Sequence, residues 1–265
     1  MSRLNEILRI KQREAEALAT PEQLDHLRNS LTHTDQPRGF LLTLRAQRRG
    51  LIAEIKRASP SRGVLTDSFD PTAMALAYQR GGADAVSVVT DREFFGGSTH
   101  DLMVARRSVT CPVLRKDFLL NEAQVLESRA VGADAILLIV RILDDASLIR
   151  LRESAEALGM DALVEAHSQI EIERAVSSGA SIIGVNNRDL DNFTVDLTAS
   201  ERLRSAIPAG ILAVSESGIA NRQDADRLFD AGYDAILVGE SIVRHTDREA
   251  AVRSLRPHAT TGSVR

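Results

Sequence analysis

From residue 51 onward, short apolar runs alternate with helix-like stretches, and this alternation constrains the fold more than any other feature. Eight runs are rich in β-branched residues, which is typical of buried strands. The stretches between them open with helix-capping residues, as at Asp70, Asn121, Ser168 and Asn221. Strands that alternate with helices favour parallel pairing through crossover helices. The predicted strands span residues 51–56, 85–90, 112–116, 135–140, 162–165, 182–186, 211–215 and 235–239.

A degenerate glycine repeat supports this count. Gly82, Gly132, Gly179 and Gly232 each stand shortly before a predicted strand, where a glycine ends the preceding helix. Successive members lie 50, 47 and 53 residues apart, which corresponds to two βα units of about 25 residues each. Eight parallel strands in a chain of this length predict one closed (β/α)8 TIM barrel. A doubly wound open sheet is the alternative, and the lack of a Gly-x-Gly-x-x-Gly turn after the first strand disfavours it.

The first 50 residues have a different, all-helical pattern. Leu4, Ile7 and Leu8 form an apolar stripe at helical spacing, and Lys11 begins a charged face. The segment 20–23, Thr-Pro-Glu-Gln, has the composition of a capping box with proline at the first helical position. A second helix is therefore expected to begin near residue 21.

These patterns divide the chain into three parts. Residues 1–50 are a predicted helical extension packing on the barrel, and they include a third helix over 40–49 that leads into the first strand. Residues 51–257 are the predicted barrel, and 258–265 a disordered tail. The extension is expected either to cover one end of the barrel or to help build the rim of its site.

Composition narrows the classes of function. The formal net charge is −4, so the chain has no global positive field for nucleic acid. Cys111 is its single cysteine, which favours a reducing compartment and rules out an intrachain disulfide. The apolar run 135–140 is far shorter than the ~20 residues of a membrane helix. We therefore expect a cytoplasmic protein without nucleic-acid or membrane partners, and a monomer, with a homodimer as the alternative. The six histidines lack metal-ligand spacing, so no metal is predicted.

Polar side chains collect at the predicted carboxyl ends of the strands, where (β/α)8 barrels carry their reaction sites. Glu54 and Lys56 stand two apart on the first strand, so they project from one face. A structural ion pair is the plainer interpretation of these two residues. Glycine-containing turns after strands seven and eight are typical of a phosphate site in this fold. We therefore predict a site for a phosphorylated small molecule. The polar ends are Glu54 and Lys56, Lys116 and Asp117, Glu165, Asn186 and Arg188, Ser215–Gly218, and Gly239–Ser241.

Six segments together resemble indole-3-glycerol phosphate synthase, over about residues 1–255. The resemblance implies a carbon–carbon lyase of tryptophan biosynthesis that needs no metal or organic cofactor. Its reaction closes, decarboxylates and dehydrates 1-(2-carboxyphenylamino)-1-deoxyribulose 5-phosphate to indole-3-glycerol phosphate. The segments are 53–61, Ala-Glu-Ile-Lys-Arg-Ala-Ser-Pro-Ser, with 114–118, 163–165, 184–190, 215–218 and 238–240.

The resemblance also implies roles for the matching residues. Lys116 would be the general acid that protonates the substrate carbonyl, and Glu165 the base or proton relay in dehydration. Lys56, positioned by Glu54, would hold the departing carboxylate and part of the phosphate. The remaining implied contacts are Asn186 and Glu216 for the sugar hydroxyls; Ser59 and the backbone at Ser217, Gly218, Gly239 and Glu240 for the phosphate; Phe94 or Phe95 with Leu114 and Phe118 for the anthranilate ring; and Arg188 to order the site.

Two physical expectations accompany these roles. A carboxylate is unfavourable beside a phosphate, so only the backbone N–H of Glu240 is expected to bind it. Two lysines in one mouth are expected to lower each other's pKa, which would make Lys116 a better proton donor near neutrality.

Two other functions remain open. A lysine could form a Schiff base with a sugar-phosphate carbonyl, which would make the chain an aldolase. The barrel could instead bind a phosphosugar without catalysis, although the combination of Lys56, Lys116 and Glu165 argues against this.

Overall fold

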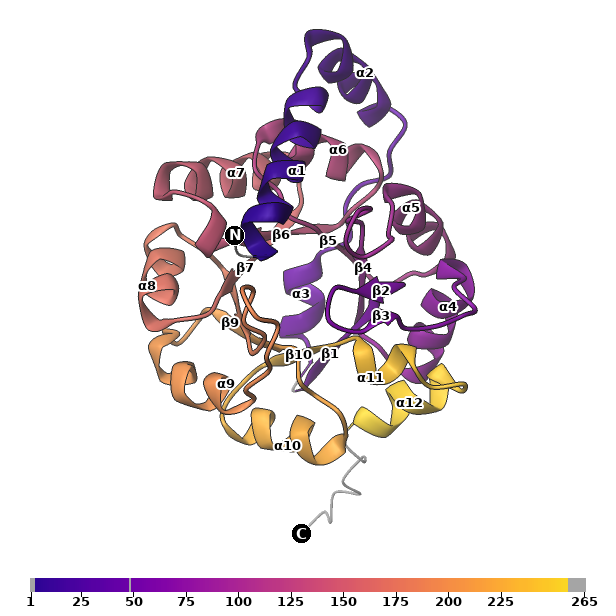
Figure 1. The fold of residues 1–265 in the computed structure, drawn as a ribbon, viewed down its shortest axis with the longest axis vertical. Coiled ribbons are helices and arrows are strands. Elements are labelled where there is room, and N and C mark those ends of the chain that lie inside the picture. The colour runs from indigo at the N-terminus through magenta and orange to yellow at the C-terminus, as the bar shows by residue number, and fades with distance from the viewer. Residues whose placement is uncertain (1–2, 48, 257–265) are drawn as a thin grey trace.

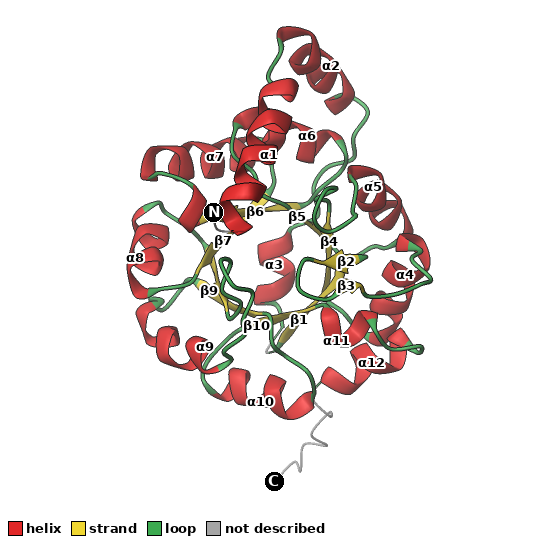
Figure 2. Cartoon of the chain, in the orientation of Figure 1, coloured by secondary structure: helices red, strands yellow, loops and turns green. Residues whose placement is uncertain are grey.

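The eight predicted strands form a closed parallel barrel in the computed structural model, which describes residues 3–47 and 49–256 (Figures 1 and 2). Strand β1 pairs with β10 on one side and with β4 on the other, which closes the ring. The predicted (β/α)8 fold is confirmed. The barrel strands are β1 (Gly50–Ile55), β4 (Ala85–Val89), β5 (Val113–Lys116), β6 (Ala135–Ile139), β7 (Asp161–Ala166), β8 (Ile182–Asn186), β9 (Leu212–Glu216) and β10 (Ala235–Val238).

Helices surround the ring, and their ends follow the predicted signals (Figure 2). Asp70, Asn121, Ser168 and Asn221 each accept a hydrogen bond from the backbone N–H three residues on. The four repeat glycines have φ between 83° and 99°, a left-handed conformation that a glycine adopts without strain. The elements are α4 (Pro71–Gly81), α5 (Thr99–Ser108), α6 (Glu122–Ala130), η1 (Val140–Ile142), α7 (Asp145–Ala157), α8 (Gln169–Ser177), α9 (Thr198–Leu203), η2 (Arg204–Ala206), α10 (Arg222–Asp230), α11 (Glu240–Val243) and α12 (Arg248–Leu255).

Strand residues alternate between two cores. One apolar cluster fills the space between the strands and the outer helices, and a second fills the barrel interior. The interior cluster includes Ile52, Leu114, Leu163 and Val214, all completely buried. Branched aliphatic side chains therefore fill the lumen, and the site lies above them at the strand ends.

The segment before β1 closes the end of the barrel where the strands begin. Phe40 and Leu44 of helix α3 (Phe40–Arg45) are fully buried in the interior cluster. The N–H of Leu41 donates to Asp161 Oδ2, at the start of β7, over 2.9 Å. Helix α3 ends four residues earlier than predicted, because the chain must turn before Gly50 pairs with β10.

Helix α1 (Arg3–Leu18) lies at the opposite end, where the strands finish. The prediction that Lys11 begins a charged outer face is wrong, because this residue is only 2% exposed. Lys11 Nζ lies 2.9 Å from Asp91 Oδ2 and 2.8 Å from Asp117 Oδ1, just beyond β4 and β5. It also contacts Glu14, one turn on in α1, at 2.9 Å. Paired carboxylates offset the desolvation of the ammonium and fasten α1 to the barrel mouth.

The loop after β1 contains an element that the sequence did not predict. Strands β2 (Ala58–Ser59) and β3 (Gly63–Val64) pair as a short antiparallel hairpin. Helix α2 (Pro21–Leu31) begins where predicted, with Thr20 as its cap. None of the helices in the described part of the chain is long and apolar enough to cross a membrane. The predicted tail lies outside the described residues.

Replacing Lys11 by alanine tests how α1 is held. The substitution removes the shared cation from two buried carboxylates, so the free energy of unfolding should fall by about 3–5 kcal/mol. Urea denaturation measures the loss. Arg13→Ala, on the exposed side of the same helix, should change stability by less than about 0.5 kcal/mol. Equal effects of the two substitutions would contradict the anchoring role of Lys11.

Candidate active site

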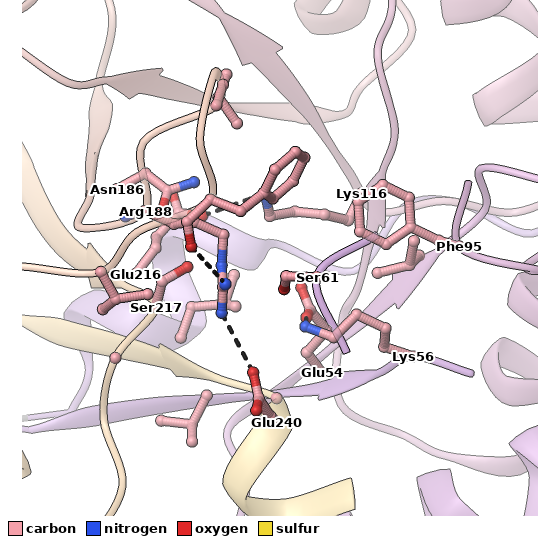
Figure 3. A pocket seen from close by; sticks show the side chains of 18 of the residues that line it. Glu54, Lys56, Ser61, Phe95, Lys116, Asn186, Arg188, Glu216, Ser217 and Glu240 are labelled. Carbon is pink, nitrogen blue, oxygen red and sulfur yellow. Dashed lines mark hydrogen bonds and ion pairs between the residues drawn. The ribbon is translucent and has the colours of Figure 1, made fainter. Parts of the chain in front are cut away.

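A cavity of about 760 Å³ opens at the carboxyl ends of the strands (Figure 3). The structure brings most of the predicted site residues together around it. The polar groups come from different strands and converge on one space, as the barrel topology predicts. The predicted residues in its wall are Glu54, Lys56, Phe95, Lys116, Phe118, Glu165, Asn186, Arg188, Glu216, Ser217, Gly218, Gly239 and Glu240.

Three predicted residues do not line this cavity. Leu114 is fully buried in the barrel interior, because its side chain points below the mouth. Phe94 packs on the interior cluster, and its neighbour Phe95 takes the place in the wall. Ser59 is 7% exposed, and its Oγ has no hydrogen-bond partner among the described residues. Ser61 and Arg62, farther along the same loop, line the cavity instead.

Other residues of the cavity wall were not predicted from the sequence. Arg62 lies directly after the segment 53–61 that carried the resemblance, and that position was the one available signal. Phe193 and Val195 lie in the loop after β8, and Arg244 follows α11. These loops carry no periodic pattern that would place their side chains.

Lys116 is the centre of the charged cluster. Its Nζ lies 2.9 Å from Glu165 Oε2 and 3.4 Å from Glu216 Oε2. Burial opposes the charge on Lys116, but Glu165, Glu216 and Glu54 outweigh it and raise the pKa of the ammonium. The prediction that a second lysine lowers the pKa of Lys116 is therefore wrong, because its charged neighbours are carboxylates. Lys116 therefore keeps its proton at neutral pH.

The pKa values of the two carboxyl groups beside Lys116 are displaced in opposite directions. Burial raises the pKa of Glu216 to about 8 against the effect of Lys116, helped by Glu165 and Glu54. At Glu165 burial acts in the same sense, but Lys116, His167 and a hydrogen bond from Asn186 bring the pKa below its ordinary value. Near neutrality one carboxyl is therefore ionised and the other is largely protonated, an arrangement suited to acid–base work.

Glu54 and Lys56 form the ion pair that their spacing predicted. Lys56 Nζ lies 2.7 Å from Glu54 Oε1 (Figure 3). A Cβ on Gly239 would lie 2.6 Å from the same Oε1, so a larger residue at this strand end would displace the Glu54 carboxylate. Glu54 is thus held between Lys56 and the end of β10, and the ammonium remains in the cavity wall.

The loops after β9 and β10 form one corner of the cavity. Ser217 has φ of 67°, a conformation that costs a non-glycine residue about 1–3 kcal/mol. Gly218 follows with φ of 84°, and a Cβ there would lie 2.6 Å from Val195. Strain of this kind is concentrated at functional sites. The assignment of this corner to a phosphate stays a prediction.

Glu240 stands beside that corner between two arginines. Its Oε1 lies 3.4 Å from Arg62 Nε. Its Oε2 lies 3.2 Å from an Arg188 guanidinium nitrogen (Figure 3). Arg188 also donates to the carbonyl of Phe193 over 3.2 Å. The carboxylate neutralises two cations that face the cavity. Within residues 3–47 and 49–256, no three His, Cys, Asp or Glu side chains are arranged to hold a metal ion.

The fold and this cluster define the class of protein: a (β/α)8 barrel enzyme whose acid–base groups lie at the strand ends. A sequence model of the indole-3-glycerol phosphate synthase family matches residues 4–255. The chain is 46% identical over 247 residues to the indole-3-glycerol phosphate synthase of Chloroherpeton thalassium, covering 92% of this chain and 95% of that protein. Indole-3-glycerol phosphate synthase 2 of Ralstonia nicotianae is 43% identical over 250 residues, or 92% and 93% of the two chains. The chain belongs to the indole-3-glycerol phosphate synthase family.

Solved structures of other barrels share the fold. A thiamine phosphate pyrophosphorylase from Pyrococcus furiosus has a TM-score of 0.60 at 18% identity, covering 80% of this chain and 95% of that one. An N-acetylmannosamine-6-phosphate 2-epimerase from Clostridium perfringens has a TM-score of 0.58 at 19% identity, covering 74% and 88%. At this level of identity the similarity concerns the architecture alone.

The raised pKa of Glu216 has a consequence for stability. The folded state holds a proton that the unfolded state releases near pH 4.5, so stability should fall as the pH rises from about 5 to about 8. Glu216→Gln removes this titration and should flatten the fall, measured by urea denaturation at pH 5 and pH 8. Glu22→Gln, on the exposed side of α2, is the control. An identical pH dependence in wild type and Glu216→Gln would contradict the raised pKa.

The position of Glu240 predicts a gain in anion binding when its charge is removed. Glu240→Gln frees Arg62 and Arg188 and removes a repelling carboxylate. Inorganic phosphate should therefore bind roughly threefold to tenfold more tightly, equivalent to about 1 kcal/mol. Isothermal titration calorimetry measures the change, again with Glu22→Gln as control. Unchanged phosphate affinity would show that Glu240 does not compete at this corner.

Proposed function

We propose that the chain carries out the reaction of its family, with the cavity at the strand ends as its active site. It converts 1-(2-carboxyphenylamino)-1-deoxyribulose 5-phosphate to indole-3-glycerol phosphate, carbon dioxide and water, a carboxy-lyase step of tryptophan biosynthesis. The observation that carries the assignment of roles is the protonated Lys116 between an ionised Glu165 and a largely neutral Glu216. Acid and base are present together in one water-limited space.

Lys116 acts in ring closure. Attack by the aromatic carbon on the ketone builds negative charge on its oxygen, and a positioned ammonium supplies the proton. The raised pKa of Lys116 keeps that proton in place until the substrate arrives. Glu165 and Glu216 orient the ammonium from two sides.

Lys56 acts in decarboxylation. The attacking ring carbon carries the carboxylate, and loss of this group as carbon dioxide restores the aromatic ring. Lys56 holds the carboxylate next to this carbon, while Glu54, at 2.7 Å, fixes the direction of the ammonium. Because Glu54 partly neutralises Lys56, the carboxylate is oriented without being bound so tightly that its departure is opposed.

Glu165 acts in dehydration as the base that removes a proton from carbon. Its lowered pKa keeps it ionised at neutral pH, as a base must be. Asn186 and the protonated Glu216 form hydrogen bonds with the sugar hydroxyls of the substrate. Phe95 and Phe118, with ring centroids 6.4 Å apart, flank the anthranilate ring.

The phosphate occupies the corner at Ser217, Gly218 and Gly239, where the backbone N–H groups are its donors. Binding there lies far from the bonds that change, so it orients the ring for attack. Proton transfers and loss of carbon dioxide balance without a change of oxidation state in any helper group, so the reaction calls for no organic cofactor. We further propose that the chain works in the cytoplasm as a monomer, in line with the free thiol of Cys111.

The deciding experiment incubates the protein with the carboxyphenylamino-deoxyribulose phosphate and follows indole fluorescence and released carbon dioxide. Lys116→Ala should lower kcat by at least about 10²–10⁴-fold, because the proton donor is lost. Arg13→Ala should leave kcat unchanged. No product from folded wild-type protein would overturn the function, and a mild effect of Lys116→Ala would remove Lys116 as the principal acid.

The same chain distinguishes the aldolase alternative cleanly. It contains three lysines, Lys11, Lys56 and Lys116, so a Schiff base reduced with borohydride can be located by mass spectrometry. Our proposal expects no adduct at Lys56 or Lys116. A substrate-sized adduct at either lysine would favour covalent catalysis instead.

A further inference from the structure

His167 lies behind Glu165, on the side away from the cavity. It follows β7 directly and its side chain is 7% exposed, yet it is absent from the cavity wall that contains Glu165. None of the roles above uses it. A buried imidazole in contact with a catalytic carboxylate is a candidate for proton exchange.

The contact between His167 and Glu165 is of an unusual kind. Nε2 of the imidazole lies 3.5 Å from Glu165 Oε1. Neither atom has a hydrogen-bond partner within residues 3–47 and 49–256. The other oxygen of Glu165, Oε2, is taken by Lys116 at 2.9 Å. Glu165 therefore presents one oxygen to the ammonium and leaves the other directed at the imidazole.

The far side of the imidazole fixes its tautomer. Nδ1 lies 3.3 Å from Glu171 Oε2, which also accepts the backbone N–H of His167 over 2.7 Å. Burial raises the pKa of Glu171, but hydrogen bonds with His167 and the positive charge of Arg141 outweigh burial. The pKa of Glu171 therefore lies below its ordinary value. An ionised Glu171 accepts the Nδ1–H, so Nε2 turns its lone pair to Glu165. Nε2 and Glu165 Oε1, 3.5 Å apart, are then the two atoms that share one proton, and with that proton on Nε2 the positive ring favours the ionised form of Glu165.

Charged side chains surround this pair on both sides. Glu165 and Glu171 flank the imidazole, and Asp189 in the loop after β8 also interacts with it. Two cations stand on the outer side of these carboxylates: Lys116 against Glu165, and Arg141 at 3.6 Å from Glu171. An imidazolium would thus sit between two ionised carboxylates rather than in an apolar pocket.

We propose that His167 is a positioning residue that stores a proton for Glu165 during turnover. When Glu165 has taken a proton from the substrate, its O–H bond breaks as an N–H bond forms at Nε2, which leaves an imidazolium and an ionised Glu165. When the product leaves, the proton returns through Glu165 to Lys116, which gave its own proton to the ketone oxygen. The protonated Glu216 supplies the proton on which the hydroxyl departs as water, and solvent replaces this one proton, which loss of a carboxylate as carbon dioxide consumes. The inference rests on the proposed role of Glu165 as the base.

The test compares three variants by kcat, KM and thermal melting on the natural substrate. His167→Ala should lower kcat about tenfold or more with little change in KM, because His167 does not touch the substrate. Added imidazole should restore part of the lost kcat. His167→Gln keeps hydrogen-bonding groups and volume but cannot carry the proton, so its kcat should be as low, without rescue. His26→Asn, on the exposed side of α2, is the matched control.

The outcomes separate this inference from the function itself. Wild-type kcat in folded His167→Ala, or full activity of His167→Gln, would overturn proton storage. His167→Gln keeps the test decisive if His167→Ala does not fold. Inactive wild-type protein would instead count against the proposed function, before any variant is compared.

Discussion

Pairing of buried ammonium groups with carboxylates is the constraint on which this barrel mouth depends. The chain has three lysines among 33 basic residues, and all three lie at the carboxyl end of the barrel against Asp or Glu. An ammonium can give up its proton, whereas a guanidinium in a protein cannot. The barrel mouth thus contains every lysine of the chain, and lysine is the basic side chain that can transfer a proton.

The same pairing connects the architecture to the site. Lys11 joins α1 to Asp91 and Asp117, and Asp117 directly follows Lys116. Asp91 in turn accepts the backbone N–H groups of Phe94 and Phe95. The helix that precedes the barrel is therefore linked by hydrogen bonds to the aromatic wall and to the strand that carries the central ammonium. A cation in an N-terminal helix thereby helps to order a site formed by later strands.

Local patterns predicted the barrel because each signal acts within a few residues: β-branched runs, caps such as Asn121, and glycines such as Gly132 that end helices. Local patterns gave the wrong environment for Lys11, because helical periodicity contains no information on the two carboxylates that follow distant strands and contact this residue. The strand-end residues of the site were predictable from topology. Which of Phe94 and Phe95 faces the cavity, and where Arg62 reaches, depends on loop paths that tertiary contacts decide.

The pKa of Lys116 is raised, whereas the sequence led us to expect a lowered one. A sequence shows which charged residues exist but not which of them are nearest to one another. Beyond burial, neighbours also explain why Glu165 and Glu216 differ although both touch the same ammonium. Glu54 and Glu165 add negative charge around Glu216, which keeps its proton to about pH 8. His167 and Asn186 favour the ionised form of Glu165. Acid–base asymmetry at this site is therefore a property of the residues behind the two carboxyl groups, since the lysine between them is common to both.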